Sequence, residues 1–262
     1  MSETVASRGA VITGGGRGIG AATARALAGL GARVVVAARH ENEVESVAAE
    51  LRQAGGQAWA TRCDVTDAAS IDALARTAVE RLGTVDILVN NAGTASAAPL
   101  HRTTLEEWQR LLTVNATGTF LCTRALLPAM LERGWGRVVN VASIAGLEGA
   151  KYISAYCAAK HAVVGFTRAL AAETAGSGVT VNAVCPGYVD TPLTDTTLDN
   201  VAQRTRKSRE EALQAILTHS GQPRLVTAQE VASTIVALCD AGAAALTGQT
   251  IVLDAGALRG GA

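Results

Sequence analysis

The sequence predicts an α/β fold in which short parallel strands alternate with helices, and three observations predict it. Apolar β-branched runs recur along the chain, and most are followed by a segment with apolar residues at helical spacing. Hydrophobic residues make up 48% of the chain and aromatic residues only 3%, so the core consists of Ala, Val, Leu and Ile. The 27 glycines permit close backbone approach. This composition suits helices laid on a buried parallel sheet.

The length and the charge balance limit what the chain can be. At 262 residues it has room for one large α/β domain or two small ones, and we expect one domain over 1–262 because α/β folds often reach this size as one unit. Lys plus Arg and Asp plus Glu both total 23, so the formal net charge is zero. Neither nucleic acid nor an anionic membrane is therefore expected as a partner. The N-terminus is short and polar and no apolar run is long enough to span a bilayer, which favours a cytoplasmic location.

The cysteines predict neither disulfides nor a metal site. There are five, at positions 63, 122, 157, 185 and 239, with no CxxC pair and no paired histidine spacing. An odd number of cysteines embedded in apolar segments is typical of reduced thiols that serve in packing.

Strands and helices alternate along the chain. Strands are expected over 9–13, 33–37, 57–63, 85–89, 138–141, 179–185 and 250–253. Helices are expected over 19–30, 41–54, 68–82, 104–133, 154–172 and 227–240. The polar stretch 192–221, with a short helix at 209–217, is typical of either a mobile surface connection or a lid. The helix at 154–172 is apolar over more than one stripe, which favours burial against another subunit.

A glycine loop follows the first strand. Its sequence is Gly14-Gly15-Gly16-Arg17-Gly18-Ile19-Gly20, between an apolar strand and a segment of helical spacing. Glycines at such a turn let the backbone approach a pyrophosphate, and the helix N-terminus offers N–H donors and a favourable dipole. A lone glycine pattern is weak, but strand, loop and helix together predict a dinucleotide site.

The end of the second strand bears on the choice of dinucleotide. Enzymes that use NAD usually carry an acid about 20 residues beyond the glycines, where it binds the ribose hydroxyls. Here Ala38 takes that place and Arg39 follows. Arg39 and Arg17 can clamp a 2′-phosphate because guanidinium matches phosphate geometry, so we favour NADP(H). In the alternative, which leaves NAD(H) possible, both arginines are surface residues and Glu41 binds the ribose.

Two further strand ends are expected to border the cofactor. Asp64 and Val65 follow the third strand, where Asp64 is a loop residue of N-cap type, the group that reads the adenine amine, or both. The fourth strand runs into Asn90-Asn91-Ala92-Gly93. Amide side chains at such a position can tie neighbouring strands together and border the cofactor.

A carbonyl or alcohol site is predicted near the fifth strand. That strand leads to Ser143, and Tyr156 and Lys160 lie one helical turn apart on one face of the following helix. A free phenol has a pKa of about 10. A neighbouring ammonium is expected to lower that pKa, so that Tyr156 exchanges a proton near neutral pH while Ser143 hydrogen-bonds the substrate oxygen. The alternative is a buried tyrosine beside a solvated lysine.

Asn115 lies among apolar residues inside the predicted helix 104–133. A buried amide must find partners or cost about 1–3 kcal/mol. Asn115 is therefore either a satisfied core amide or a local helix break that anchors a water near Lys160.

Six motifs occur in register along the chain: Thr13-Gly14-x-x-x-Gly18-x-Gly20, Asn90-Asn91-Ala92-Gly93, Asn115, Ser143, Tyr156-x-x-x-Lys160 and Pro186-Gly187. Together they resemble the short-chain dehydrogenase/reductase family, close to its 3-oxoacyl thioester reductases and polyketide ketoreductases, over nearly the whole chain. The resemblance implies a single-domain Rossmann fold with a seven-stranded parallel sheet and helices on both faces. It also implies a homotetramer and a lid at 192–221 that closes over the substrate.

The resemblance assigns roles to the predicted site residues. Tyr156 exchanges the proton, Ser143 holds the carbonyl oxygen, and Lys160 binds the nicotinamide ribose while it lowers the pKa of the phenol. Asn115 positions the water of a proton relay. The residues expected to border the nicotinamide are Pro186, Gly187, Val189 and Thr191, the last at its carboxamide or phosphate.

The substrate prediction depends on two departures from the family. Its carrier-protein reductases carry two arginines at places held here by Gly134 and Ser177. A coenzyme A thioester, a cyclic ketone or another small carbonyl compound is therefore favoured over a carrier-bound chain. The basic run 204–209 is a solvated face or a contact for an anionic coenzyme A.

The sequence thus predicts an NADP(H)-dependent oxidoreductase for a 3-oxoacyl-type carbonyl or its alcohol. The alternatives are an NAD-dependent secondary alcohol dehydrogenase and, from another class, a nucleotide-binding sensor without catalysis.

Overall fold

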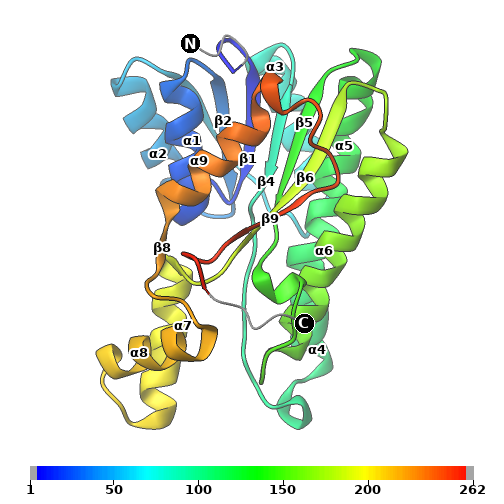
Figure 1. Ribbon diagram of the computed structural model, residues 1–262. Helices are drawn as coiled ribbons and strands as arrows, with labels where there is room; N and C mark the ends of the chain where they lie inside the picture. Colours follow the sequence, from blue (N-terminus) through cyan, green and yellow to red (C-terminus); the bar gives the residue numbers. More distant parts are fainter. Residues whose placement is uncertain (1–4, 258–262) are drawn as a thin grey trace.

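A seven-stranded sheet forms the centre of the computed structural model, which describes residues 5–257 (Figure 1). The strand order is β3-β2-β1-β4-β5-β6-β9, and every neighbouring pair is parallel. The strands are β1 (Gly9–Thr13), β2 (Arg33–Ala38), β3 (Gln57–Arg62), β4 (Ile87–Asn90), β5 (Gly136–Val141), β6 (Val179–Pro186) and β9 (Thr250–Leu253). The predicted α/β Rossmann fold is confirmed.

Helices cover both faces of the sheet (Figure 1). One face carries α1 (Gly18–Gly29), α2 (Glu41–Gln53) and α9 (Ala228–Cys239). The opposite face carries α3 (Ala68–Leu82), α5 (Gly118–Glu132) and α6 (Ser154–Glu173). Leu27, Val44 and Ile235 pack in the first layer, and Leu74 and Met130 in the second. Within the described residues, every helix is too short or too polar to cross a membrane.

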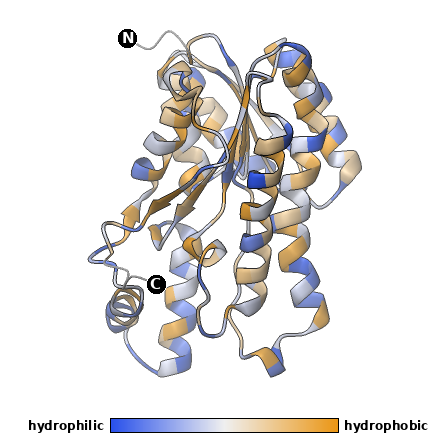
Figure 2. Cartoon of the chain, turned by 45° about the vertical axis from the view of Figure 1, so that its right-hand side comes forward, coloured by the Kyte–Doolittle hydropathy of each residue, from blue (hydrophilic) through white to orange (hydrophobic). Residues whose placement is uncertain are grey.

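The sheet positions the site through its topology. Every residue of β5 and β6 is buried, which explains why these strands read as nearly continuous apolar runs. Figure 2 shows hydrophobic strands inside and mixed polarity on the outer helices. The strand order reverses between β1 and β4, and ligands of such sheets bind in the crevice beyond the carboxyl ends of the strands at that point.

The expected single helix over 104–133 is wrong, because it is two helices. They are α4 (Leu105–Leu112) and α5, joined by a π-helical turn at Thr113–Thr117. The Asn115 side chain donates from Nδ2 to the carbonyl of Leu111 at 2.9 Å, and the N–H of Gly118 reaches back to the carbonyl of Thr113. The local break that the sequence offered as one interpretation of Asn115 is therefore present.

The fourth strand begins at Ile87, two residues later than expected. The reason lies in Asp86, whose side chain accepts a hydrogen bond from the backbone N–H of Gly9 at 2.9 Å. Asp86 therefore contacts strand β1 through its carboxylate as well as through its backbone.

A smaller lobe extends beyond the carboxyl ends of the strands (Figure 1). It contains α7 (Pro192–Thr205) and α8 (Arg209–Ser220), and its base is a two-stranded parallel sheet of β7 (Val189–Asp190) and β8 (Val226–Thr227). The helix expected at 209–217 is present, whereas α7 was not expected. Leu198, Ala212 and Ile216 form the small core between the two helices.

Candidate active site

The glycine loop brings the backbone of β1 against the end of β4. Gly14 has a φ of +63°, and a Cβ there would lie 2.8 Å from Asn91 Nδ2 and 2.9 Å from the Cα of Ala92. Only glycine fits such a position. Helix α1 then begins after Arg17 without a side-chain cap, so its first N–H groups remain available. An uncapped helix N-terminus behind a glycine turn fits a dinucleotide pyrophosphate.

A cleft opens at this loop, and most of the residues predicted to bind the dinucleotide line it. These are Gly14, Gly16, Arg17, Gly18, Ile19, Ala38, Arg39, Asp64, Val65, Asn91, Ala92, Gly93 and Thr191. Gly20 does not line the cleft. It packs beneath the loop, where a Cβ would lie 2.5 Å from Asn91 Nδ2. Sequence reasoning missed His40, Glu43, Cys63, Val114, Pro192 and Leu193.

Charged side chains gather at the adenosine end of the cleft. Arg17 and Arg39 both line it, and so does Glu43, which lies 3.8 Å from the Arg17 guanidinium. The acid beside Arg17 in the cleft is therefore Glu43, in the first turn of α2, whereas Glu41 does not line the cleft. Glu43 could have been identified from the sequence, because it lies two residues beyond Glu41 in the same first turn of the helix.

Asp64 serves as a loop residue. Its Oδ1 accepts from both the N–H and the hydroxyl of Thr66, at 2.9 and 2.7 Å. Partial burial raises the pKa of the Asp64 carboxyl, but these hydrogen bonds and the charges of Arg39 and Arg62 outweigh it, so the net pKa is lowered. Asp64 also lines the cleft, so it remains available at the cofactor edge as an acceptor.

The two asparagines after β4 tie strands together, as their amides led us to expect. Asn91 Nδ2 donates to the carbonyls of Thr13 and Gly14 at 3.0 and 2.9 Å. Asn90 Nδ2 donates to Thr123 Oγ1 at 2.9 Å and Asn140 Oδ1 at 2.8 Å. Thus the loops that border the cleft are fixed by side-chain amides and do not depend on the ladder alone.

A second cavity adjoins the dinucleotide cleft and shares Ile19, Asn91, Gly93, Thr191 and Leu193 with it. The proposed catalytic set lines this one cavity: Asn115, Ser143, Tyr156 and Lys160. The residues expected beside the nicotinamide line it as well: Pro186, Gly187, Val189 and Thr191. Sequence reasoning missed Thr94, Val141, Ala142, Leu193 and Thr194.

Tyr156 and Lys160 lie one turn apart on α6, and the lysine Nζ is 5.9 Å from the centroid of the phenol ring. Lys160 is 5% exposed and donates from Nζ to the carbonyl of Val141 at 2.9 Å. The alternative of a solvated lysine is therefore wrong. Burial lowers the pKa of Lys160 to about 8.

The expected lowering of the tyrosine pKa is not found. Burial raises the pKa of Tyr156 to about 12, and the hydrogen bond with the Ser143 side chain offsets only part of that rise. The physical reason is that desolvation of a phenolate costs more than these neighbours return. At neutral pH the phenol therefore keeps its proton and is arranged as a donor.

Ser143 is held where β5 ends. Its Oγ accepts from the N–H of Ala145 at 3.1 Å and donates to the carbonyl of Pro186 at 3.4 Å. Because that donor bond is long, it competes weakly with a better acceptor. A carbonyl oxygen within reach of both Ser143 and Tyr156 would receive hydrogen bonds from both hydroxyls.

Asn115 is satisfied by protein groups. Its Nδ2 donates to the carbonyls of Thr94 and Leu111, both at 2.9 Å, and its Oδ1 accepts from the N–H of Thr94 at 3.2 Å. Both interpretations of this residue thus hold in part, since it is a core amide that also marks a break in the helix. A Cβ on Gly93 would lie 2.9 Å from Asn115 Oδ1 and 3.6 Å from Lys160 Nζ, so the two side chains converge at this glycine.

The cysteines lie in the interior of the protein, and one of them, Cys63, also lines the dinucleotide cleft. All five cysteines are buried and form no disulfide, as the sequence led us to expect. Across residues 5–257, no group of three or more His, Cys, Asp or Glu side chains is placed to hold a metal ion.

Comparison with known proteins agrees with this geometry. Residues 8–202 match the family described as short chain dehydrogenase. A putative ketoacyl reductase of Streptomyces coelicolor is 43% identical over 244 residues, which cover 92% of this chain and 94% of the relative. A cis-4-hydroxycyclohexanecarboxylate dehydrogenase of Sinomonas cyclohexanicum is 41% identical over 259 residues, 98% of each protein.

A solved structure gives the same result. An actinorhodin polyketide ketoreductase crystallised with NADPH matches at a TM-score of 0.92 and 41% identity, over 98% of each chain. This chain therefore belongs to the short-chain dehydrogenase family and is an oxidoreductase of that family.

Proposed function

We propose that this protein is an NADP(H)-dependent carbonyl reductase that acts on a 3-oxoacyl compound of the coenzyme A type or a related ketone. The observation that carries the proposal is that Asn115, Ser143, Tyr156 and Lys160 line one cavity that is continuous with the dinucleotide cleft. A non-catalytic sensor would not need that convergence.

The chain's own residues hold the substrate oxygen and supply its proton. Ser143 Oγ and the Tyr156 phenol donate hydrogen bonds to the carbonyl oxygen, and the phenol then transfers its proton to that oxygen as negative charge develops there. Lys160 holds the ribose hydroxyls and keeps a positive charge close to the phenol. When bound, the nicotinamide supplies the hydride.

The preference for NADP(H) rests on Arg17 and Arg39. Both line the cleft, and no acid stands at Ala38, where a carboxylate would bind the ribose hydroxyls. The similar ketoreductase solved with NADPH supports the same choice. Glu43 partly neutralises Arg17 at 3.8 Å, so we assign Arg39 the larger share of the discrimination.

A small substrate is favoured over one delivered by a carrier protein. Arg133, the basic residue nearest to Gly134, is engaged in contacts within the protein: it donates to the carbonyl of Val85 at 2.5 Å and lies 3.7 Å from Asp86. At the second place, Ser177 donates from Oγ to the carbonyl of Thr174 at 2.6 Å. An acidic carrier therefore has no free arginine at either place.

Two arginines in the basic run of the lid are already engaged within the protein, so they are less available to bind an anionic substrate. Arg209 is paired with Asp195 and Asp199, and Arg204 donates to the carbonyl of Ala97 at 2.9 Å. We therefore assign the specificity of the site to the cavity walls and to the lid at 192–221, rather than to a basic surface for coenzyme A.

We also propose a homotetramer, as in the resemblance. Phe120 on α5 is 42% exposed and packs edge-on against Phe166 of α6, with ring centroids 6.2 Å apart. An aromatic pair with one exposed ring, Phe120, and one partly buried ring, Phe166, suits a subunit interface. Light scattering on the purified protein measures the assembly.

The test of the function is turnover by wild type and by Tyr156→Phe. The wild type should oxidise NADPH with a panel of 3-oxoacyl thioesters and cyclic ketones, and the variant should lose at least about a hundredfold in kcat because its proton donor is gone. Full turnover by the variant would contradict the role of Tyr156. Faster turnover with NADH than with NADPH would favour the secondary alcohol dehydrogenase instead.

A further inference from the structure

The two ends of the lid meet at one buried side chain. Gln222 is 3% exposed and follows directly after the left-handed Gly221 that ends α8. Its Oε1 accepts from the N–H of Tyr188 at 2.8 Å, and its Nε2 donates to the carbonyls of Tyr188 and Arg224 at 3.2 and 3.3 Å. One amide thus joins the segment that enters the lid to the segment that leaves it.

Tyr188 connects this amide to the catalytic cavity. It follows Pro186 and Gly187, both of which line that cavity. The Ser143 hydroxyl donates to the carbonyl of Pro186, and the N–H of Gly187 donates to the carbonyl of Leu253 on β9 at 2.8 Å. The Gln222 amide therefore acts two residues away from the hydrogen-bond partner of the catalytic serine.

Gly187 is fitted to the same amide. A Cβ at Gly187 would collide with the Gln222 carboxamide oxygen. Gly187 is not one of the described glycines with a positive φ. The close approach of Gln222, rather than the backbone conformation, therefore explains why glycine is needed there.

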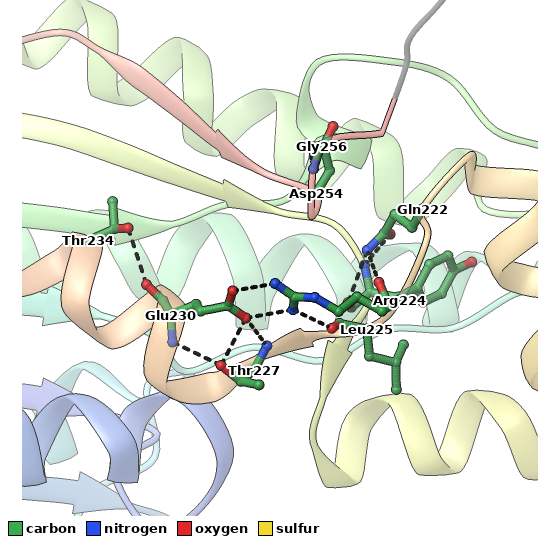
Figure 3. Close-up of polar contacts among 9 residues, drawn as sticks. Gln222, Arg224, Leu225, Thr227, Glu230, Thr234, Asp254 and Gly256 are labelled. Atoms are coloured by element: carbon green, nitrogen blue, oxygen red, sulfur yellow. Dashed lines mark hydrogen bonds and ion pairs between the residues drawn. The ribbon is translucent and has the colours of Figure 1, made fainter.

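The base of the lid has other connections, among them the N–H of Val226, which donates to the carbonyl of Tyr188 at 3.0 Å. The β7 and β8 ladder has two residues in each strand, and such a short pair has little stability alone. Arg224 and Glu230 form an ion pair with two hydrogen bonds at 2.8 and 2.6 Å (Figure 3), but both side chains are exposed, so water and salt screen it. The buried amide is therefore the most specific connection at this point.

We propose that Gln222 is a positioning residue, which holds the two ends of the lid together and so fixes Val189, Thr191 and Leu193 as walls of the catalytic cavity. The effect of Gln222 on catalysis rests on the proposed function, whereas its role in connecting the two ends of the lid does not. Only an amide supplies an acceptor and two donors in one side chain of this length. An apolar or a charged replacement therefore loses part of the joint.

The experiment compares Gln222→Met, Gln222→Glu and, as a matched control, Gln214→Met, which changes an exposed glutamine on α8. Hydrogen exchange is measured on the purified protein without any substrate. Gln222→Met should exchange about tenfold faster than wild type in peptides from 188–226, because the Tyr188 N–H loses its acceptor and the lid opens more often. Peptides from β1, β4 and β5 should keep wild-type rates, as should the control throughout.

Kinetics separate a positioning role from a general loss of structure. In Gln222→Met, the KM for a carbonyl substrate should rise about tenfold while kcat changes by less than about threefold, because the proton donor is untouched. In Gln222→Glu, the introduced carboxylate accepts from Tyr188 but repels two carbonyl oxygens. Acidification from about pH 8 to about pH 6 should protonate it and bring KM back toward the wild-type value.

Two results would overturn the inference: wild-type exchange at 188–226 in Gln222→Met, or faster exchange spread evenly over the whole sheet. If Gln222→Met does not fold, Gln222→Glu provides the test. A KM of that variant that does not change with pH would contradict the proposed role of Gln222. If wild type reduces no carbonyl compound, the proposed function fails, yet the exchange result still decides whether Gln222 joins the lid.

Discussion

Replacement of Lys160 by methionine should stabilise the fold while it removes activity. Burial lowers the pKa of Lys160 from 10.5 to about 8. That difference corresponds to about 3 kcal/mol of folding free energy spent at neutral pH to keep a charge in the core. The methionine leaves the carbonyl of Val141 without its partner, which costs about 1–3 kcal/mol. We therefore expect a net gain of up to about 2 kcal/mol.

The pKa of Lys160 also determines how the free energy of unfolding should change with pH. Between about pH 8 and about pH 10.5 the unfolded chain binds the lysine proton and the folded chain has released it. Stability therefore rises with pH in this window and the lysine penalty disappears at its upper end. Buried cysteines, such as Cys122 and Cys239 with pKa values raised to about 12, act in the opposite direction in both proteins. The difference between wild type and Lys160→Met cancels their effect.

Urea unfolding of wild type and Lys160→Met at several pH values measures that difference. The advantage of the variant should be greatest below about pH 8 and should shrink by about 3 kcal/mol as pH rises to about 10.5. Lys151→Met, at an exposed position in the preceding loop, is the matched control and should change stability little at any pH. A gap between wild type and Lys160→Met that does not vary with pH would refute the reasoning.

Three further changes test the cleft and its entrance. Gly93→Ala brings a Cβ to 2.9 Å from Asn115 Oδ1, so kcat/KM should fall at least tenfold for a stability loss of about 1–3 kcal/mol; unchanged kinetics would contradict the convergence at this glycine. Arg39→Asp should weaken NADPH binding about a hundredfold and strengthen NADH binding, measured by fluorescence titration, and equal losses for both would argue against a phosphate contact. Arg204→Ala removes the hydrogen bond to the carbonyl of Ala97 and should speed proteolysis of the lid with a stability change below about 1 kcal/mol; identical cleavage rates would show that this contact does not hold the lid.

The fold was predictable because its signals are local. Most strands are apolar runs bounded by a glycine or a polar residue, and the chain order of alternating elements leaves a parallel sheet as the arrangement that buries them. Gly14 needs its left-handed conformation, and Gly20 lies against Asn91, so the glycine spacing reflects close contacts. The convergence of Tyr156 and Lys160 on one cavity was predictable because they share one turn of one helix.

Features set by tertiary contact were not predictable. Helix α7 has a polar sequence, and Leu198 packs against α8, which a local pattern cannot show. The π-helical turn arises because the amide of Asn115 binds Thr94, from another segment, as well as Leu111 in its own helix. Gln222 looked like an ordinary polar residue after a helix, since its partner Tyr188 lies 34 residues away.

The pKa of Tyr156 was wrongly expected for the same reason. A lysine one turn from a tyrosine suggests a lowered phenol pKa only if the lysine stays charged beside it, and burial works against the charged form of both groups. Here burial moves Tyr156 to about 12 and Lys160 to about 8, so each group is pushed toward its neutral form. A neutral phenol gives a proton and cannot take one. At neutral pH the phenol is therefore in the protonated state that carbonyl reduction requires, whereas the reverse reaction, alcohol oxidation, requires the phenolate, whose share grows as pH rises.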